Sequence, residues 1–412
     1  MAPHAVIIPY PAQGHINPLI RLSEKLAAQG IVITFVNTEV NHSRMMKARN
    51  NRHGISKDPS FNIRFVQISD GLPLEFNRTD NPDEAFNALM TTARASAEDL
   101  IHNLTIQGCE PPISCVIGSS FLPWTLNVAK KFELPWVAFW SQAVSVYVIY
   151  RHLSMIIDNG DFPPKKQAGR SPLRHPDRRL IKYRASQLPA LEEAAWIIGN
   201  TVNELESQAS DAIKEKFPPI RSMGPLLPSI CFEDGEKQEE FSVVSPTSLS
   251  LWAESNCLSW LDSKQRCSVL YVSFGSMAQM SKAQVQEIAR GLMESEQVFL
   301  WVIRPDLVSS EASTDNGHIL PEGFVEKTKD RGLVVPWSPQ LLVLSHPSIG
   351  GFFTHGGWNS TMESLTLGIP MMVFPQAIEQ HTNRMLIVNQ WKNGLRLESC
   401  RGDGIIEGSE IA

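Results

Sequence analysis

Residues 353–364, FTHGGWNSTMES, combine side chains and a backbone pattern that can hold an anion. An apolar run reaches His355, two glycines allow a tight turn, and Trp358, Asn359 and Ser360 open a helix-like stretch. This order is typical of a strand, a turn and a helix N-terminus, where backbone N–H groups and the helix dipole attract negative charge. We therefore expect this stretch to seat an anion.

Polar and aromatic side chains on either side of this stretch would complete a larger site. Trp337 and Gln340 follow the preceding apolar run, Glu363 lies farther along the helix, and Glu379 and Gln380 open the next helix. If the apolar runs are adjacent parallel strands, these residues project from the carboxyl ends onto one rim. An aromatic face, an anion seat, and carboxylates beside amides together indicate a nucleotide sugar.

Each of these residues also has an ordinary structural interpretation. Trp337 and Trp358 are compatible with core packing, Glu363 with a solvated helix face, and Asn359 and Ser360 with an N-cap. Only their joint spacing favours the binding interpretation.

The elements that position these residues are predicted from short apolar runs that alternate with helical patterns. In the first half we expect strands at 5–9, 31–36, 114–118, 136–140 and 195–200, and helices near 17–29, 84–104, 122–132 and 203–216. In the second half we expect strands at 268–276, 298–303, 333–337, 350–355 and 370–374, and helices at 282–296, from 358 and from 379. Such alternation predicts an α/β protein with parallel sheets covered on both faces.

The alternation stops once, which predicts two doubly wound domains that bind ligands in the cleft between them. Residues 1–225 form the expected first domain, residues 226–248 are a linker rich in proline, serine and acidic residues, and residues 249–412 form the second domain.

Composition narrows the class of protein. The 412 residues are 42% apolar and 19% charged, and the net charge of −6 argues against nucleic acid or an anionic membrane as the main partner. The six cysteines form no C-x-x-C pair, which favours a reducing compartment. The most apolar stretch, residues 134–150, is too polar for a membrane span and is expected to be a buried strand and a packed helix. With no targeting segment visible, we expect a cytoplasmic protein. We also expect it to be a monomer.

Residues 337–380 resemble the full signature box of the plant UDP-dependent glycosyltransferases. The segments PYPAQGHINP (9–18), SFGS (273–276) and CLSWLDSK (257–264) also resemble that family, so the likeness covers nearly the whole chain. The resemblance implies the GT-B architecture, in which two Rossmann-like domains face each other across a cleft. It also implies a UDP-sugar donor and a small hydrophobic acceptor.

The resemblance assigns roles within the donor site. It implies that Trp337 stacks on uracil, that Gln340 and Glu363 bind the ribose hydroxyls, and that Trp358 belongs to the same donor set. The diphosphate would be held by Ser276, His355, Asn359 and Ser360. No metal or other cofactor is expected, because no Asp-x-Asp motif and no metal-ligand spacing of histidines occurs.

The end of the box bears on the sugar. Glu379 and Gln380 resemble the Asp-Gln pair that holds sugar hydroxyls in the family, and a final glutamine there generally accompanies glucose. UDP-glucose is therefore the expected donor, although glutamate is one methylene longer than aspartate.

His15 follows a strand and a loop just before a helix, which places it at the cleft floor. In the family the matching histidine is the general base that deprotonates the acceptor hydroxyl, which then attacks the anomeric carbon with inversion. A histidine suits this role because its ordinary pKa of about 6.5 lies near working pH. The alternative is a histidine that only caps the helix.

The sequence departs from the family in three places. Ser119 stands where the family has an aspartate beside the base, residues 190–195 are shorter than the corresponding segment, and the chain stops soon after the box, at GIIEGSEIA. Because a serine cannot stabilise an imidazolium by charge, we expect phenolic or carboxylic acceptors to be favoured.

These departures support a second hypothesis, a truncated relic that binds UDP or a small molecule without turnover. A dinucleotide oxidoreductase is less favoured, because no G-x-G-x-x-G follows AVIIP or SVLYV.

Overall fold

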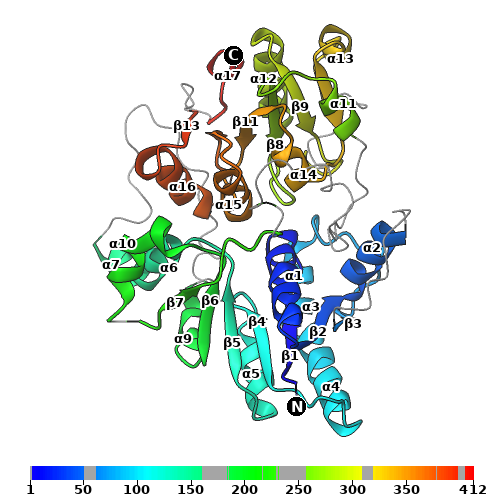
Figure 1. Cartoon of the computed structure of the whole chain (residues 1–412), viewed down its shortest axis with the longest axis vertical. Coiled ribbons are helices and arrows are strands. Elements are labelled where there is room, and N and C mark those ends of the chain that lie inside the picture. The colour runs from blue at the N-terminus through cyan, green and yellow to red at the C-terminus, as the bar shows by residue number, and fades with distance from the viewer. Residues whose placement is uncertain are drawn as a thin grey trace. The chain divides into compact units, whose positions relative to one another are not determined.

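The chain is described by a computed structural model that covers residues 2–50, 62–159, 183, 185–215, 217–228, 231, 257–308, 319–376, 378–397 and 404–412 (Figure 1). It divides into two compact units, Met1–Val148 with Arg184–Ala253, and Ile149–Tyr183 with Glu254–Ala412. The predicted linker, 226–248, lies largely outside the described residues.

The first unit is built on a seven-stranded parallel sheet with the order β3-β2-β1-β4-β5-β6-β7, which is the doubly wound order. Its strands are β1 (His4–Ile8), β2 (Val32–Thr38), β3 (Ile63–Ile68), β4 (Cys115–Ser119), β5 (Trp136–Trp140), β6 (Trp196–Gly199) and β7 (Ile220–Ser222). The helices between the strands are α1 (Gln13–Ala28), α2 (Glu39–Asn50), α3 (Pro82–Met90), α4 (Thr92–Ile106), α5 (Trp124–Lys131), α6 (Val144–Arg151), α9 (Leu188–Leu191) and α10 (Asn203–Ile213). Helix α7 (Leu153–Asp158) follows α6 in the chain but belongs to the second unit.

The five strands predicted in the first half are all present, and two helix predictions need correction. The single helix expected at 84–104 is two helices, α3 and α4, because the chain bends at Thr91, whose hydroxyl donates back to the carbonyl oxygen of Asn87 at 2.8 Å. Helix α1 begins at Gln13, earlier than expected, so His15 lies within its first turn.

The apolar stretch 134–150 is the buried strand and packed helix that were predicted. Glu206 is 2% exposed, and its carboxylate accepts from the backbone N–H groups of Val144 and Ser145 at 2.9 and 3.0 Å. The same carboxylate accepts from the hydroxyl of Thr201 at 2.7 Å. A buried carboxylate thus satisfies the N-terminus of α6, which would otherwise lack acceptors.

The second unit holds a six-stranded parallel sheet with the order β10-β9-β8-β11-β12-β13. Its strands are β8 (Val269–Ser273), β9 (Val298–Val302), β10 (Gly332–Val335), β11 (Ile349–Thr354), β12 (Met371–Val373) and β13 (Gly394–Arg396). The helices are α11 (Leu258–Asp262), α12 (Lys282–Glu294), α13 (Phe324–Thr328), α14 (Gln340–Ser345), α15 (Trp358–Thr366), α16 (Ile378–Met385) with the π-helical turn η4 (Leu386–Gln390), and α17 (Gly408–Ile411).

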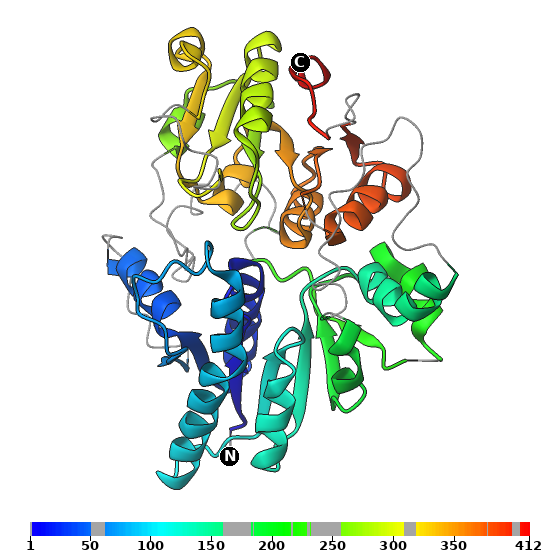
Figure 2. The ribbon, with the colours of Figure 1, turned by 180° about the vertical axis from the view of Figure 1, so that it is seen from behind.

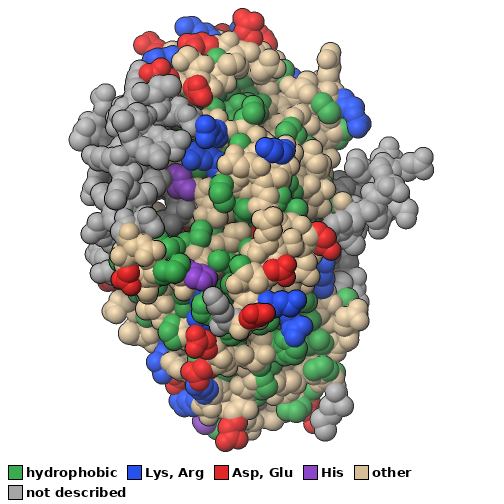
Figure 3. All heavy atoms as spheres, turned by 90° about the vertical axis from the view of Figure 1, so that its left-hand side faces the viewer, with side chains coloured by type: hydrophobic (Ala, Val, Ile, Leu, Met, Phe, Trp, Pro, Cys, Tyr) green, Lys and Arg blue, Asp and Glu red, His purple; other side chains and the backbone are tan. Residues whose placement is uncertain are grey.

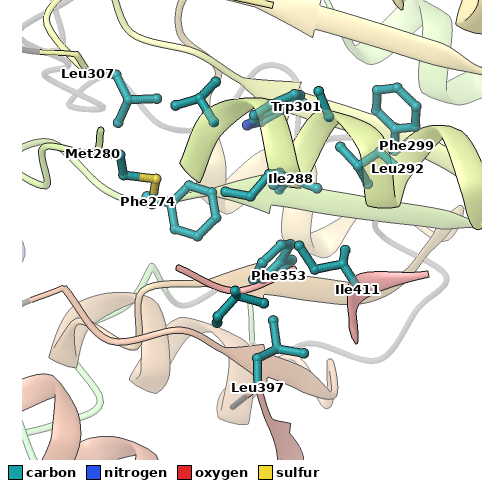
Figure 4. Packing of buried hydrophobic residues seen from close by; sticks show 14 of the residues in the cluster. Phe274, Met280, Ile288, Leu292, Phe299, Trp301, Leu307, Phe353, Leu397 and Ile411 are labelled. Atoms are coloured by element: carbon teal, nitrogen blue, oxygen red, sulfur yellow. The ribbon is translucent and has the colours of Figure 1, made fainter. Parts of the chain in front are cut away.

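Both faces of this second sheet are buried, as predicted for parallel strands. Neighbouring residues of one strand enter different cores: Phe353 packs with residues of α12 and with Ile411, whereas Phe352 packs with α14 residues such as Val343. Figure 4 shows the first of these cores, with Ile288 of α12 facing the strands and Ile411 beside Phe353. Helices also flank the strands in the two ribbon views (Figures 1 and 2).

One prediction about the second sheet is wrong. The strand that precedes Trp337 and Gln340 is β10, which lies at the edge of the sheet and is separated from β11 by β9 and β8. These two residues therefore do not project from a strand adjacent to that of His355. Gln340 instead opens α14, which carries the chain back toward β11 and contacts α15.

The strand order gives each sheet one switch point, where connections leave in opposite directions and where doubly wound proteins bind ligands. In the first sheet this point lies between β1 and β4, and in the second between β8 and β11. His15 follows β1 and His355 follows β11, so each unit carries a histidine at its switch point.

On the face shown in Figure 3, basic and acidic side chains are interspersed over the described residues. No large field of one sign covers the described residues on this face. Within the described residues, no helix is both long and apolar enough to cross a bilayer.

Candidate functional site

The site in the first unit is centred on His15, which is 8% exposed. Its Nδ1 lies 3.0 Å from the hydroxyl oxygen of Ser119, the last residue of β4, and its Nε2 lies 3.4 Å from the hydroxyl oxygen of Ser141, which directly follows β5. Because β1, β4 and β5 are neighbours in the sheet, three successive strand ends bring these side chains together. The serine expected beside the histidine is therefore in contact with it.

Ser119 is itself held in place. It is fully buried, and its hydroxyl oxygen accepts from the backbone N–H of Phe121 at 3.3 Å. The interpretation of His15 as a helix cap is wrong, because the N-cap of α1 is Ala12 and the imidazole bonds to two strand ends instead.

Aromatic rings surround the imidazole. The ring centroids of Tyr10 and Phe121 lie 5.2 and 4.7 Å from that of His15, and Trp140 stands edge-on to Phe121 at 6.1 Å. Such a lining excludes water from the base and offers apolar and aromatic contact to a ligand.

Sequence reasoning missed Ser141 as a partner of the base. The signal lay in WSQ at the end of a predicted strand, but it could be used only once β5 was known to neighbour β4. The amide oxygen of Gln142, which follows, is buried and has no hydrogen-bond partner within the described part of the chain. A ligand that brings a donor, or a water molecule, can satisfy a buried acceptor of this kind.

The site in the second unit begins with His355, whose ring lies between two glycines. A Cβ atom added to Gly275 would stand 2.6 Å from Cε1 and Nε2 of this ring, and one added to Gly357 would stand 2.4 Å from Nε2. Gly275 also has a φ of +73°, which favours glycine. The two turns can thus approach the imidazole only because both positions lack a side chain.

His355 is a neutral hydrogen-bonding group rather than a cation. Burial, and to a smaller extent the positive charge of Arg304, lower its pKa from the ordinary 6.5 to about 4. Near pH 7 the ring therefore carries one N–H donor. A neutral imidazole can donate this N–H to a phosphate oxygen.

The predicted helix N-terminus is present. Trp358, Asn359 and Ser360 are the first three residues of α15, whose N-cap is Gly357. In an α-helix the N–H groups of these positions are the ones that a ligand can reach, and the helix dipole favours an anion there. The N-cap interpretation of Asn359 and Ser360 is therefore wrong.

The indole of Trp358 needs a correction. Its side chain is 4% exposed and packs against Trp391, with ring centroids 6.2 Å apart. The side chain thus belongs to the core, as the packing interpretation held, and only its backbone amide remains available to a donor. Trp337 differs, because it lies in the loop after β10 and is partly exposed.

The residues expected at the ribose form a connected network. The amide nitrogen of Gln340 donates to a carboxylate oxygen of Glu363 at 2.7 Å and to the hydroxyl of Ser360 at 3.0 Å. The hydroxyl of Tyr271 lies 3.4 Å from the amide oxygen of Gln340, and it also bonds to Ser338 at 2.9 Å. Glu363 is thus an oriented carboxylate and not a solvated helix face.

The pair expected at the sugar opens α16. Gln380 is 6% exposed, and its amide oxygen accepts from the backbone N–H of Gln376 at 2.7 Å, whereas Glu379 is partly exposed. One turn farther on, Asn383 donates to the carbonyl oxygen of Gly356 at 2.9 Å. This bond ties the helix of the sugar pair to the turn of His355.

Ser276 completes the set, in the turn after β8, with its carbonyl oxygen bonded to Arg304 at 2.6 Å. No cluster of three or more histidine, cysteine, aspartate or glutamate residues suited to a metal ion occurs among the described residues.

Comparisons with known proteins match both the first and the second unit. The family model described as UDP-glucoronosyl and UDP-glucosyl transferase matches residues 254–398, and the model described as Glycosyltransferase, N-terminal domain matches residues 4–106. The 7-deoxyloganetin glucosyltransferase of Gardenia jasminoides is 38% identical over 426 residues, which cover 96% of this chain and 86% of that protein. UDP-glycosyltransferase 86A1 of Arabidopsis thaliana is 36% identical over 423 residues, covering 96% and 82%.

A solved structure is also similar. Os79 from O. sativa in complex with UDP superposes with a TM-score of 0.80 at 25% sequence identity, over 99% of this chain and 89% of that one.

Two doubly wound parallel sheets, each with a histidine at its switch point, define a glycosyltransferase of the GT-B architecture that uses a UDP-sugar. The chain belongs to the plant UDP-glycosyltransferase family.

Proposed function

We propose that this protein transfers glucose from UDP-glucose to a phenolic or carboxylic group of a small hydrophobic molecule, with inversion at the anomeric carbon. The observation that carries the acceptor half of this proposal is the contact of His15 with Ser119 and Ser141 at the switch point of the first sheet. The donor half rests on family membership and on the arrangement around His355.

On the donor side, each part of UDP-glucose has a counterpart in the second unit. Trp337 offers a partly exposed aromatic face for uracil, and Glu363, oriented by Gln340, offers carboxylate oxygens for the ribose hydroxyls. The neutral imidazole of His355 and the N-terminus of α15 supply N–H donors for the diphosphate. These groups hold the leaving UDP by hydrogen bonds and helix polarity, and we propose that no metal ion is needed.

The proposed sugar preference rests on Gln380 and on the similarity to the 7-deoxyloganetin glucosyltransferase of Gardenia jasminoides. Transfer measured side by side with UDP-glucose and UDP-galactose tests it. We expect clear preference for glucose, and a preference for galactose would overturn this choice.

On the acceptor side, His15 takes the proton. When Nδ1–H donates to the Ser119 oxygen, Nε2 keeps its lone pair and can remove the proton of an acceptor hydroxyl. The acceptor oxygen then forms a bond to the anomeric carbon as the bond to the UDP oxygen breaks. The proton ends on His15 and the negative charge on UDP.

The serine beside the base sets the preferred acceptor chemistry. The hydroxyl of Ser119 can orient the imidazole but cannot stabilise the imidazolium by charge. Aliphatic alcohols, which need the strongest base, are disfavoured. A phenol with a pKa of about 10 needs less help, and a carboxylic acid with a pKa of about 4 is already ionised at pH 7.

A panel of phenols, alcohols and carboxylic acids assayed with radiolabelled UDP-glucose tests the acceptor class. We expect phenyl glucosides or glucose esters as the main products. Faster transfer to simple alcohols than to phenols would refute this reasoning.

The alternative, a relic that binds UDP without turnover, is not favoured, because the match to a relative named as a glucosyltransferase extends over 96% of the chain and both site histidines are in place. Thermal shift with UDP separates the two ideas. Stabilisation by UDP together with turnover supports the enzyme, whereas stabilisation without turnover on any acceptor would favour the relic. We further propose that the protein acts as a monomer in the cytoplasm, which size-exclusion chromatography and a fluorescent fusion would test.

A further inference from the structure

Arg304 is a buried cation beside the proposed diphosphate seat. It lies two residues beyond β9 and is 2% exposed. Its guanidinium donates to the carbonyl oxygens of Ser276, at 2.6 Å, and of Ala278, and it forms an ion pair with Asp306 at 2.9 Å. Burying a cation is costly, so a fold that keeps one has bonds and charges arranged around it.

The bonds of Arg304 fix the turn that follows β8. Both carbonyl acceptors belong to residues 276–278, the segment directly after Gly275. Gly275 approaches the ring of His355 closely enough that an added Cβ would stand 2.6 Å from it. Arg304 thus determines where the hydroxyl of Ser276 and the wall beside His355 lie.

Within the described residues, the charge of Arg304 is only partly compensated. Of the three partners described for its guanidinium, two are neutral carbonyl groups, and the third, Asp306, has a side chain that is 33% exposed to water, against 3% for Arg304. Because water screens the carboxylate of Asp306, it cancels only part of the positive potential of the buried Arg304 guanidinium. The positive charge of Arg304 also acts on His355, where it lowers the pKa of the imidazole.

We propose that Arg304 is a positioning residue of the donor site, which holds the 275–278 turn against His355 and supplies fixed positive potential to the diphosphate of the leaving UDP. This inference rests on the proposed function. It assigns to a side chain outside the signature box part of the charge stabilisation that the departing diphosphate requires. Arginine suits the position because its planar fork binds two carbonyls and a carboxylate at once and stays charged when buried.

The test compares UDP with uridine, because only UDP carries the diphosphate. Isothermal titration would measure both affinities for the unmodified chain and for Arg304→Gln, Arg304→Lys and Asp306→Asn. We expect Arg304→Gln to weaken the binding of UDP about 10- to 100-fold, as for loss of a charged partner, and the binding of uridine by less than about 3-fold. Arg304→Lys should retain part of the preference for UDP, because it keeps the charge.

Asp306→Asn should change the affinity for UDP in the opposite direction, and it alters only a partly exposed side chain. With the counter-charge gone, UDP should bind several-fold more tightly relative to uridine. A purely structural role for the ion pair predicts weaker or unchanged binding instead.

Arg331 provides a matched control. Its guanidinium likewise donates to backbone carbonyls, those of Leu292, Met293 and Gln297, but it lies at the amino end of β10, whereas Arg304 follows the carboxyl end of β9. Arg331→Gln should lower the melting temperature and leave the ratio of UDP to uridine affinity unchanged.

Two results would overturn the inference: equal losses of UDP and uridine in Arg304→Gln, or no gain in Asp306→Asn. An unmodified chain that binds neither compound would instead show that the proposed donor site is wrong. Selective 13C labelling of histidine adds a second readout, because the pKa of His355 should rise above about 4 in Arg304→Gln and not in Arg331→Gln.

Discussion

Replacement of Ser119 by aspartate should convert the base of this enzyme into a charge-assisted one. The Ser119 oxygen lies 3.0 Å from Nδ1 of His15, so a carboxylate at this position would face the imidazolium that forms during transfer. It would also accept from the backbone N–H of Phe121, which already bonds to the serine. The new charge is therefore placed where two donors satisfy it.

The magnitude follows from the distance and the burial. Two unit charges about 4 Å apart attract by about 4 kcal/mol at an effective dielectric constant of about 20. Ser119 is fully buried, so desolvation of the carboxylate offsets part of this attraction. A remaining stabilisation of about 1.4 to 2.8 kcal/mol in the transition state would raise kcat/KM about 10- to 100-fold.

The assay measures initial rates of Ser119→Asp on an alcohol, a phenol and a carboxylic acid with one UDP-sugar. Alcohols should gain most and phenols less, while carboxylates, which need no base, should stay nearly unchanged. Ser119→Asn is the matched control, because it has the shape of aspartate without the charge. Equal gains for all three acceptor classes, or the same gain from asparagine, would refute the reasoning.

Three further predictions concern the second unit. His355→Ala should lower kcat, because its contact to the diphosphate strengthens as UDP departs, whereas Glu363→Ala should mainly raise KM for the donor; steady-state kinetics that leave both constants untouched would contradict the site. Gly275→Ala should lower kcat by about 10-fold or more by pushing the His355 ring aside, whereas Gly368→Ala, at a similar φ of +70° with no atom within 4 Å, should cost only stability, as rates and melting curves would show. Burial and a nearby arginine lower the pKa of His381 from 6.5 to about 4, so the unfolded chain binds more protons between these values, and stability should fall as pH drops from about 6.5 to 4; His381→Gln should flatten that decline, and an unchanged slope in thermal melts would count against it.

Much of the fold could be predicted from the sequence, because buried parallel strands are nearly continuous apolar runs. Val298–Val302 and Trp136–Trp140 are of this kind, and both were found with little error. Strand β3, Ile63–Ile68, was missed because it carries Arg64 and Gln67 and is only partly buried. Strands β7 and β13 were missed because each has three residues that are mostly exposed or partly exposed, whereas the equally short β12 is mostly buried. Short or half-exposed strands give too weak a hydrophobic signal.

The site was predictable to the extent that it is local in sequence. The turn of His355 and the start of α15 lie within one continuous motif, so their geometry follows from strand, turn and helix rules. The contact of His15 with Ser141 depends on strand order across 126 residues, and the bond from Gln340 to Glu363 depends on a helix that returns from an edge strand. Arg304 gave no signal, because an arginine after a strand is ordinary until its burial is known.

The two switch points have an evolutionary consequence. Each histidine is enclosed by strand ends of its own sheet: β1, β4 and β5 enclose His15, and β8 and β11 enclose His355. The contacts described above for each histidine lie within its own sheet, so mutations that reshape one set leave the other set intact. Acceptor range and sugar preference can therefore evolve independently. Recombination between genes of this family can also combine the donor domain of one enzyme with the acceptor domain of another. A large family of enzymes with one donor chemistry and many acceptors is the outcome that such an arrangement favours.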